Sequence, residues 1–489
     1  MTPQTDTKSV DAPRAASPPL YVDLDGTLLR TDMLLECAAR FVCRHPWKSF
    51  LLLVWALRGP AQLKARLAEY FEQDAATLPW NRPVLEWLQA QSRESGRALV
   101  LATAANEQIA NRLARHLGIF SHVLASSSTS NLKGEHKLAA IEAHARGPFV
   151  YVGNDSADLP IWKRASAAVV VSGSNSLLAR ARSLTQLEKH FVPEGPSLRV
   201  LLRALRVHQW SKNLLVFAPM LAAHLWRSAD AWLATGVMFL AFSLSASAIY
   251  CVNDLIDLPA DRAHPRKHTR PFAAGTLSIG SALLITPLLL AFGFAIAWSI
   301  GTLPVITLAA YVVTTFAYSF VLKRIVLVDV ITLASLYTVR VIGGAAAIAV
   351  APSFWILALS MFLFLSLALI KRYSELHTLA QGERVSASGR DYSVGDRNVM
   401  MSLGIGAGFC GVMVMALFLN NPAITELYPR PYLLWGLCVT LLYWIARMWV
   451  KASRGEMHDD PLVYACTDRA SLFMAVLSAG VVLAASWPA

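Results

Sequence analysis

Apolar runs of two different lengths divide this chain. Between residues 19 and 190, short apolar runs alternate with stretches of helical periodicity, and the runs lie in LYVDLDG, RALVLATAA, PFVYVGND and AAVVVSG. Short buried runs that alternate with helices are typical of a parallel sheet covered by helices. The pattern therefore predicts an N-terminal α/β domain over residues 19–190.

Two segments of this half depart from the alternation. Residues 32–80 interrupt it after the first strand and have helical periodicity, which predicts a helical cap. Within the cap, FLLLVWAL at 50–57 is too short to span a bilayer, so it belongs either to the cap core or to a patch that contacts lipid. Residues 1–18 are polar and predicted to be disordered, and the stretch 191–199, rich in Pro and Gly, is predicted to be a linker.

From residue 200 to residue 489 the apolar runs become long enough to cross a membrane. They predict an all-α polytopic domain of nine transmembrane helices. The expected spans are 213–228, 231–252, 278–300, 303–322, 326–349, 353–370, 399–420, 431–450 and 470–487. With the N-terminus inside, the even-numbered spans end at the most basic loops. This asymmetry predicts a multi-pass protein of the cell (inner) membrane whose N-terminal domain lies in the cytoplasm.

Composition and charge agree with this division. Of 489 residues, 55% are hydrophobic and 16% are charged, as expected for a membrane protein with a soluble part. The net charge of +12 comes largely from residues beside apolar segments, so membrane topology explains it and we expect no nucleic-acid partner. The six cysteines show no metal-like spacing, which argues against both a zinc site and a disulfide framework.

The most informative polar segment is NDLIDLPADRAHPRKHTRPFAAG at 253–275, which follows a long apolar run. Acidic residues at the edge of a bilayer are costly and indicate a functional site. Their spacing in a continuous helix would place Asn253, Asp254, Asp257 and Asp261 on one face. We expect this face to hold Mg²⁺ and the basic run to bind phosphate, through Arg262, Arg266, Lys267 and Arg270. The alternatives are a loop that sets topology and a site for anionic lipid.

The segment DLDGT at 23–27 resembles the first motif of the haloacid dehalogenase phosphatases. The resemblance implies a Rossmann-like domain with a cap, in which Asp23 attacks phosphorus and Asp25 protonates the leaving oxygen. Strand alternation would point both side chains to one face. The family's second and third motifs match Thr103 and Lys137, with Lys133 as a second choice for the lysine.

The fourth motif of that family departs from its usual form. It reads GNDSAD at 153–158, which places Asn154 where the first acidic metal ligand is expected, keeps Asp158 in register and displaces Asp155 by one. The magnesium ligands that the resemblance implies are therefore Asp23, Asp25, Asn154, Asp155 and Asp158. The alternative is a degenerate domain with a purely structural role.

The pattern NDxxDxxxD before a basic loop, within about nine helices, resembles the UbiA superfamily of intramembrane transferases. The resemblance covers 198–489 and begins at HQWSKNLLVFAP, which contains Lys212. Typical aromatic prenyltransferases of this family carry a second aspartate-rich motif, whereas this chain has Asp329 alone there. The neighbouring residues suit phosphate instead, namely Tyr318, Lys323, Tyr337 and Arg340.

The stretch 367–393 resembles one branch of that superfamily, the polyprenyl-phosphate phosphoribosyltransferases. Lys371, Arg372, Tyr373, Glu375 and Arg390 match the pattern of this branch. The resemblance implies transfer of ribose 5-phosphate from phosphoribosyl diphosphate to a polyprenyl phosphate, with Mg²⁺ as cofactor and membrane lipids as surroundings. The fused phosphatase domain would then hydrolyse the 5-phosphate of the product.

Two other functions stay open at this point. The first is an aromatic prenyltransferase that acts on a quinone or haem precursor with a prenyl diphosphate donor. The second is a non-catalytic membrane scaffold that carries a degenerate phosphatase domain. In a scaffold, no function would offset the free-energy cost of placing the acidic cluster at the edge of the bilayer.

Overall fold

The computed structural model describes residues 17–487, except residue 73 and the segments 382–390, 423–427 and 458–459. The predicted disorder of residues 1–18 lies almost wholly outside the described residues, as does Arg390. The chain forms two compact units. The first contains residues up to 204 together with 254–283, and the second contains 205–253 together with 284–489.

A six-stranded parallel sheet forms the centre of the first unit, in the order β3-β2-β1-β4-β5-β6. Its strands are β1 Leu20–Val22, β2 Leu99–Asn106, β3 His122–Ser126, β4 Val150–Gly153, β5 Ala167–Val171 and β6 Gln186–Phe191. Strand β1 pairs with both β2 and β4, and Tyr21 lies opposite Val100 on one side and Tyr151 on the other. All three residues of β1 are buried. The predicted parallel α/β fold is therefore confirmed.

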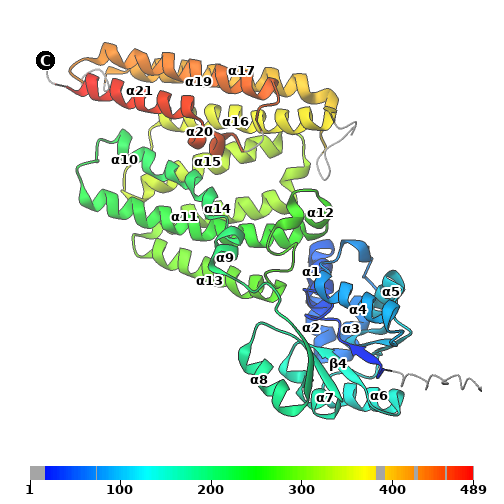
Figure 1. The fold of residues 1–489 in the computed structure, drawn as a ribbon. Helices are drawn as coiled ribbons and strands as arrows, with labels where there is room; N and C mark the ends of the chain where they lie inside the picture. The colour runs from blue at the N-terminus through cyan, green and yellow to red at the C-terminus, as the bar shows by residue number, and fades with distance from the viewer. Residues whose placement is uncertain (1–16, 73, 382–390, 423–427, 458–459, 488–489) are drawn as a thin grey trace, which may run out of the picture. The chain divides into compact units, whose positions relative to one another are not determined.

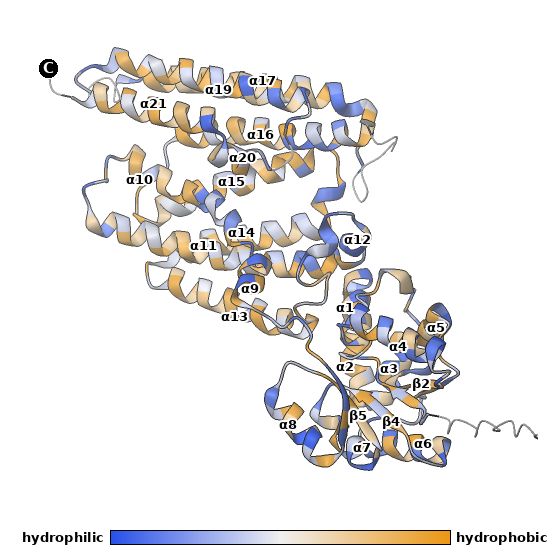
Figure 2. Cartoon of the chain, in the orientation of Figure 1, coloured by the Kyte–Doolittle hydropathy of each residue, from blue (hydrophilic) through white to orange (hydrophobic). Residues whose placement is uncertain are grey.

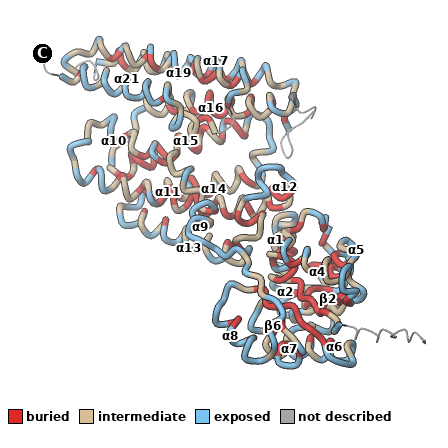
Figure 3. Tube along the Cα trace, viewed as in Figure 1, coloured by how far each residue is buried: buried red, intermediate tan, exposed pale blue. Residues whose placement is uncertain are grey.

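The sequence analysis did not predict strands β3 and β6, and both lie at the edges of the sheet. Strand β6 reads QLEKHF and exposes half of its residues, while β3 reads HVLAS and is only partly buried. An edge strand is covered on fewer sides than a central one, so it needs no continuous apolar run. The four central strands, buried in Figure 3, are those that the apolar runs predicted.

Helices connect the strands and cover the sheet. Between β1 and β2 lie the cap helices α1 Met33–Arg44, α2 Phe50–Leu57 and α3 Pro60–Ala68. The others are α4 Arg82–Glu94, α5 Glu107–Leu117, α6 Glu135–Ala145, α7 Leu159–Arg164 and α8 Asn175–Leu184. Because all strands are parallel, their carboxyl ends and the following loops meet at one edge of the sheet, where ligands of such folds bind.

The segment 254–283 is part of the first unit and packs against the start of its cap. It contains α12 Leu258–Ala263 and the 3₁₀ helix η5 Lys267–Thr269. Arg262 donates to both carboxylate oxygens of Glu36 on α1, at 2.7 and 3.1 Å, and to the carbonyl of Ala273 at 3.1 Å. Gly275 has φ +69°, and a side chain there would approach Arg30 to 2.7 Å. A buried ion pair and a close backbone approach therefore hold this segment on the cap.

Eight helices among the described residues are long and apolar enough to cross a membrane (Figure 2). They are α11 Ala229–Ile256, α13 Ile279–Trp298, α14 Thr302–Phe320, α15 Val328–Ala347, α16 Phe354–Gln381, α17 Arg397–Leu419, α19 Trp435–Ser453 and α21 Arg469–Ser486. Helices α13 and α21 are strongly apolar, yet the protein buries 17% and 11% of their most apolar segments. Apolar helix surface that the protein leaves uncovered requires lipid around it.

The predicted count of nine spans does not hold for the described residues. The stretch 213–228 is not one long helix but a 3₁₀ helix, η4 Val207–Phe217, followed by the short helix α10 Ala218–Ala222. Pro219 lies in the first turn of α10, where the helix has no hydrogen bond that needs the backbone N–H that proline lacks. Lys212 and Asn213 are buried and form polar contacts, which a helix surrounded by lipid could not offer them.

Close packing of η4 against α15 provides a test of this arrangement. A side chain at Gly344 would approach the carbonyl oxygen of Val216 to 1.9 Å, so Gly344→Ala must push two backbones apart. We expect this overpacking to cost about 1–3 kcal/mol and to lower the unfolding temperature in detergent. The control is Gly236→Ala on α11, where no atom lies within 4 Å and the unfolding temperature should stay or rise. Equal unfolding temperatures for both variants would contradict the packing.

Candidate functional site

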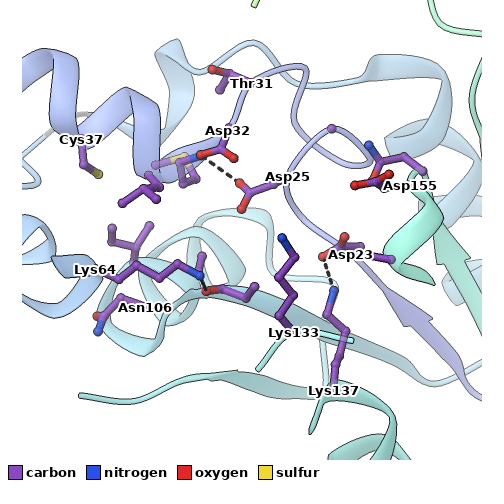
Figure 4. Close-up of a pocket in the computed structure, with 18 of the residues that line it drawn as sticks. Asp23, Asp25, Thr31, Asp32, Cys37, Lys64, Asn106, Lys133, Lys137 and Asp155 are labelled. Atoms are coloured by element: carbon purple, nitrogen blue, oxygen red, sulfur yellow. Dashed lines mark hydrogen bonds and ion pairs between the residues drawn. The ribbon is translucent and has the colours of Figure 1, made fainter. Parts of the chain in front are cut away.

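A cavity of about 390 Å³ lies in the first unit, lined by residues that follow β1, β2 and β4 (Figure 4). Asp23 and Asp25 both line it, as predicted, although strand alternation is not the reason. Strand β1 ends at Val22, and both aspartates lie in the loop beyond, which turns through Gly26 at φ +71°. This glycine conformation allows the loop to present both carboxylates to one cavity.

Lys137 lies directly against the predicted nucleophile. Its ammonium group donates to Asp23 Oδ1 at 2.9 Å and to the Tyr151 hydroxyl at 3.1 Å, and Tyr151 donates to Asp158 at 2.9 Å. Burial alone would lower the pKa of Lys137, but Asp23 and Asp158 outweigh burial and raise it. Lys137 therefore stays charged beside Asp23, where the charge of a phosphate would need neutralising.

The pKa of Asp25 lies in the range that proton transfer near neutral pH requires. Burial, followed by the negative charges of Asp32 and Asp23, raises the pKa of Asp25 to about 7. One of its oxygens accepts from the backbone N–H of Met33 at 2.9 Å, which holds the carboxyl in place. A carboxyl group with such a pKa can donate a proton to a leaving group and take one from water.

The unusual fourth motif forms a well-ordered loop. Asp158 Oδ2 accepts from the backbone N–H groups of Asn154 and Asp155 at 2.9 and 3.0 Å, so Asp158 holds the loop together. The side-chain amide oxygen of Asn154 accepts from the Thr27 hydroxyl at 3.1 Å, and the side-chain amide nitrogen lies where a side chain on Gly26 would be. Asn154 and Asp155 both line the cavity.

One predicted residue lies behind the cavity, and one unexpected residue lies in it. Thr103 is fully buried, its hydroxyl accepts from the N–H of Ala105 at 3.0 Å, and it is not among the residues that line the cavity. Lys64 reaches the cavity from α3 and donates to the Ala104 carbonyl at 2.6 Å and to Asn131 at 2.8 Å (Figure 4). Sequence reasoning missed Lys64, because a cap lysine carries no local motif.

The donors around this cavity suit a magnesium ion held partly by water. Within the described part of the chain, no three His, Cys, Asp or Glu side chains come together as a metal site. Asp23 and Asp155 offer carboxylates, and Asn154 offers an amide oxygen. Mg²⁺ takes oxygen ligands and keeps several waters, so two carboxylates are sufficient.

The acidic cluster at the end of α11 has a different geometry from the one expected. Helix α11 ends at Ile256 and α12 begins at Leu258, so the helix that the prediction took as continuous breaks at Asp257. Pro259, in the first turn of α12, cannot donate the hydrogen bond that would continue α11. Asp257 lies at the break as the residue before α12, and Asn253 is half-buried on the last turn of α11.

Arg270 compensates the charge of this cluster. Its Nη1 lies 2.6 Å from Asp261 Oδ2 and 3.4 Å from Asp254 Oδ1, and both carboxylates are buried. The predicted phosphate ligand Arg262 instead faces Glu36, while Lys267 is exposed on η5. The positive group among these carboxylates is therefore an arginine in this conformation.

A second polar cluster lies in the second unit around Asp460, a residue that sequence reasoning missed. Asp460 accepts from Lys212 at 2.8 Å, from Lys371 at 3.2 Å and from the Tyr337 hydroxyl at 3.4 Å. It also begins α20 Pro461–Thr467, where its side chain accepts from the N–H of Leu462. The helix start was readable from Asp-Pro in the sequence, but the pairing depends on the fold.

Arg340 adds a further cation beside this group. It donates to Asn213 Oδ1 at 2.7 Å and to the Tyr311 hydroxyl at 3.1 Å, and it lies over the rings of Tyr311 and Tyr337. We call Lys212, Tyr337, Arg340, Lys371 and Asp460 the Asp460 cluster. Its members combine three cations with one carboxylate, so their summed charge is positive. Buried excess positive charge is favourable for binding an anion.

Arg372 and Asp329 form a separate, fully enclosed ion pair. Arg372 Nε lies 2.7 Å from Asp329 Oδ2, and the Tyr392 hydroxyl donates to the other oxygen of Asp329. Arg372 also pairs with Glu375 and donates to the Tyr318 hydroxyl at 3.4 Å. Lys323 is half-buried on the 3₁₀ helix η6 Leu322–Arg324. Apart from Lys323, the predicted phosphate ligands of this unit therefore fall into two groups, one in the Asp460 cluster and one around Asp329.

Comparison with known proteins agrees with this architecture. The model of the UbiA prenyltransferase family matches residues 214–485. The uncharacterized protein y4nM of Sinorhizobium fredii is 35% identical over 463 residues, which cover 94% of this chain and 90% of that protein. The chain belongs to the UbiA prenyltransferase family. Its residues 20–163 match the haloacid dehalogenase-like hydrolase model, so both resemblances in the sequence are confirmed.

Two further known proteins are similar to parts of the chain. The decaprenyl-phosphate phosphoribosyltransferase of Mycolicibacterium smegmatis is 36% identical over 198 residues, which cover 40% of this chain and 62% of that enzyme. A UbiA homolog from Archaeoglobus fulgidus, solved with GPP and Mg²⁺, aligns with 58% of this chain and 99% of its own at 16% identity and a TM-score of 0.46.

The Asp460 cluster of this UbiA-family protein predicts the effect of removing its carboxylate. Asp460→Ala leaves the buried ammonium group of Lys212 and the partly exposed one of Lys371 without their carboxylate, so we expect a loss of at most about 3–5 kcal/mol in unfolding free energy. The measurement is the unfolding temperature in detergent, with and without inorganic phosphate, which should stabilise this variant more than the parent. The control Glu456→Gln removes an exposed partner of Lys451 and should change stability by under about 1 kcal/mol. Equal effects of the two substitutions would contradict a buried cluster.

Proposed function

We propose that this protein transfers ribose 5-phosphate from phosphoribosyl diphosphate to a polyprenyl phosphate, and that its N-terminal domain then hydrolyses the 5-phosphate of the product. The transferase would be residues 200–489, and the phosphatase residues 19–190 with its cap at 32–80, joined by the linker 191–199. The observation that carries the choice of reaction is the enclosed pair of Asp329 and Arg372.

This pair separates the proposal from its main rival. A prenyltransferase with two aspartate-rich motifs needs free carboxylates at the second one. Here the carboxylate at that position is fully buried, with one oxygen against Arg372 and the other accepting from Tyr392. One acidic cluster and one cationic cluster suit a diphosphate donor and a phosphate acceptor. The similarity to the decaprenyl-phosphate phosphoribosyltransferase supports the same choice.

In the transfer step, an oxygen of the lipid phosphate would attack C1 of the ribose. The bond from C1 to the diphosphate oxygen breaks, and diphosphate leaves with that electron pair. Lys212 and Lys371 of the Asp460 cluster, together with Lys323, would hold the lipid phosphate, and Lys267 and Arg270 would hold the donor. Mg²⁺, held by Asn253, Asp254, Asp257 and Asp261, would supply charge neutralisation for the leaving diphosphate.

In the hydrolysis step, a carboxylate oxygen of Asp23 would attack phosphorus while Asp25 gives its proton to the departing 5-oxygen. Asp25 would then take a proton from water, which attacks the aspartyl-phosphate and releases inorganic phosphate. Lys137, at 2.9 Å from Asp23, would offset the negative charge of the phosphoryl group. Fusion raises the local concentration of this site near its substrate. We place it in the cytoplasm, because the strongly basic loops follow α11, α14, α16 and α19, which alternate along the eight long apolar helices of the described residues. Arg262, in the first of these loops, pairs with Glu36 of the phosphatase domain.

Removal of single aspartates tests the transfer. Asp254→Ala and Asp257→Ala should each abolish transfer and leave the protein folded, because each removes one negative charge from a cluster of carboxylates while Asp261 still pairs with Arg270. Mass spectrometry of the protein with polyprenyl phosphate, phosphoribosyl diphosphate and Mg²⁺ measures the product. The control Asp230→Ala lies on the exposed start of the same helix and should keep full activity. Activity with a prenyl diphosphate and none with phosphoribosyl diphosphate would favour the rival.

Loss of the nucleophile tests the coupled hydrolysis. Asp23→Asn should accumulate polyprenyl-phosphoryl ribose 5-phosphate, whereas the parent should yield the form without the 5-phosphate. The companion Asn154→Asp adds a carboxylate to the cavity and should lower the Mg²⁺ concentration that half-maximal hydrolysis requires. If both the parent and Asp23→Asn retain the 5-phosphate, the fused domain has another substrate.

A further inference from the structure

We propose that the cap of the phosphatase domain docks on the membrane surface through α2 and the turn before it. Four large apolar side chains of this segment face outward from the first unit. Their exposed fractions are 89% for Trp47, 65% for Phe50, 67% for Leu53 and 80% for Leu57. We call these four side chains the apolar cap face. Contiguous exposed apolar surface of this kind marks an interaction site.

The apolar cap face lies on one side of a helical segment whose other side is anchored. Its members follow one another at intervals of three, three and four residues, which is the spacing of a single helical face. On the opposite side, Trp55 is buried, with its ring 5.1 Å from that of Phe41 and 6.3 Å from that of Tyr70. The aromatic contacts fix α2 on the cap core, so the exposed face is a rigid part of the domain. The sequence left open whether this run is core or lipid contact, and its exposure favours lipid.

The basic residues around the apolar cap face indicate which partner it binds. Residues 37–68 contain six Lys and Arg and no Asp or Glu, and two of the six pair with acidic residues just beyond this stretch, Arg44 with Glu72 and Arg66 with Glu69. Lys48 and Arg58 are exposed and flank the apolar cap face at its two ends. A short helix with bulky apolar residues on one side and basic residues around it is typical of segments that lie in the interface of an anionic bilayer.

The membrane also fits better than a second copy of the chain. In a two-fold dimer through this face, the basic residues of both copies would meet, and no acidic residue of 37–68 could pair with them. A bilayer, in contrast, is expected next to every copy of the protein, because eight helices among the described residues of the same chain are long and apolar enough to span one. The cap also carries Lys64 into the catalytic cavity, so docking would favour phosphorylated substrates that are themselves anchored in lipid.

A lipid-quenching experiment on the full-length protein tests the docking, independently of any enzymatic activity. An environment-sensitive fluorophore is placed at Leu53→Cys, in a protein whose exposed Cys410 and Cys466 are replaced by Ser. The matched control carries the fluorophore at Arg180→Cys, an exposed position on α8. Both proteins are reconstituted in vesicles of phosphatidylcholine and phosphatidylglycerol that contain doxyl-labelled lipid.

We expect most of the emission at Leu53→Cys to be quenched, with little quenching at Arg180→Cys. Weak quenching at both positions would overturn the proposal. A second outcome would also overturn the proposal. If the emission at Leu53→Cys changes when excess lipid dilutes the protein, but doxyl-labelled lipid does not quench it, a second copy of the chain covers the apolar cap face instead of lipid. In the double variant Lys48→Glu/Arg58→Glu, quenching should fall severalfold with phosphatidylglycerol present. Unchanged quenching in this double variant would exclude recognition of anionic lipid.

Discussion

The second unit depends most on the ion pairs that the Asp460 carboxylate forms. This carboxylate binds the ammonium group of Lys212, which lies 248 residues earlier in the chain, together with Lys371 of α16 and the hydroxyl of Tyr337 of α15. Each of these groups would be costly to bury alone. Their mutual contacts explain why η4 departs from a simple spanning helix, because Lys212 must reach a polar partner inside the protein rather than lipid.

The two acidic positions of the transferase differ in how firmly their charge is already compensated. Arg270, which serves Asp254 and Asp261, has a side chain that is 29% exposed, whereas Arg372, which serves Asp329, is 1% exposed. A partly exposed arginine can turn towards a substrate phosphate while water solvates its guanidinium group, provided that another cation, such as the proposed Mg²⁺, compensates the two buried carboxylates. An enclosed arginine cannot do so without leaving a buried charge. The first position can therefore respond to ligands, while the second is part of the scaffold.

Local patterns predicted those features that depend on neighbouring residues. The central strands, the cap helices and the loop with Asp23 and Asp25 followed from apolar runs and one short motif. Contacts between distant segments could not be predicted in this way. Asp460 and Lys64 are single polar residues with no motif around them, and their roles come from partners in other elements. The break of α11 before Pro259 shows a third limit, because residue spacing alone assumed an unbroken helix.

The buried pair of Glu36 and Arg262 has a consequence for the modularity of this fusion. The first unit is assembled from two stretches of sequence, and Arg262 comes from the later one. A protein cut within residues 192–197 would leave Glu36 on α1 without its guanidinium partner and would uncover the surface at Arg30 that Gly275 approaches. The linker in the sequence therefore does not mark a boundary between two independent parts of the fold. Exchange of either half between relatives would require matched replacement of 254–283, so the two halves are expected to have changed together during evolution.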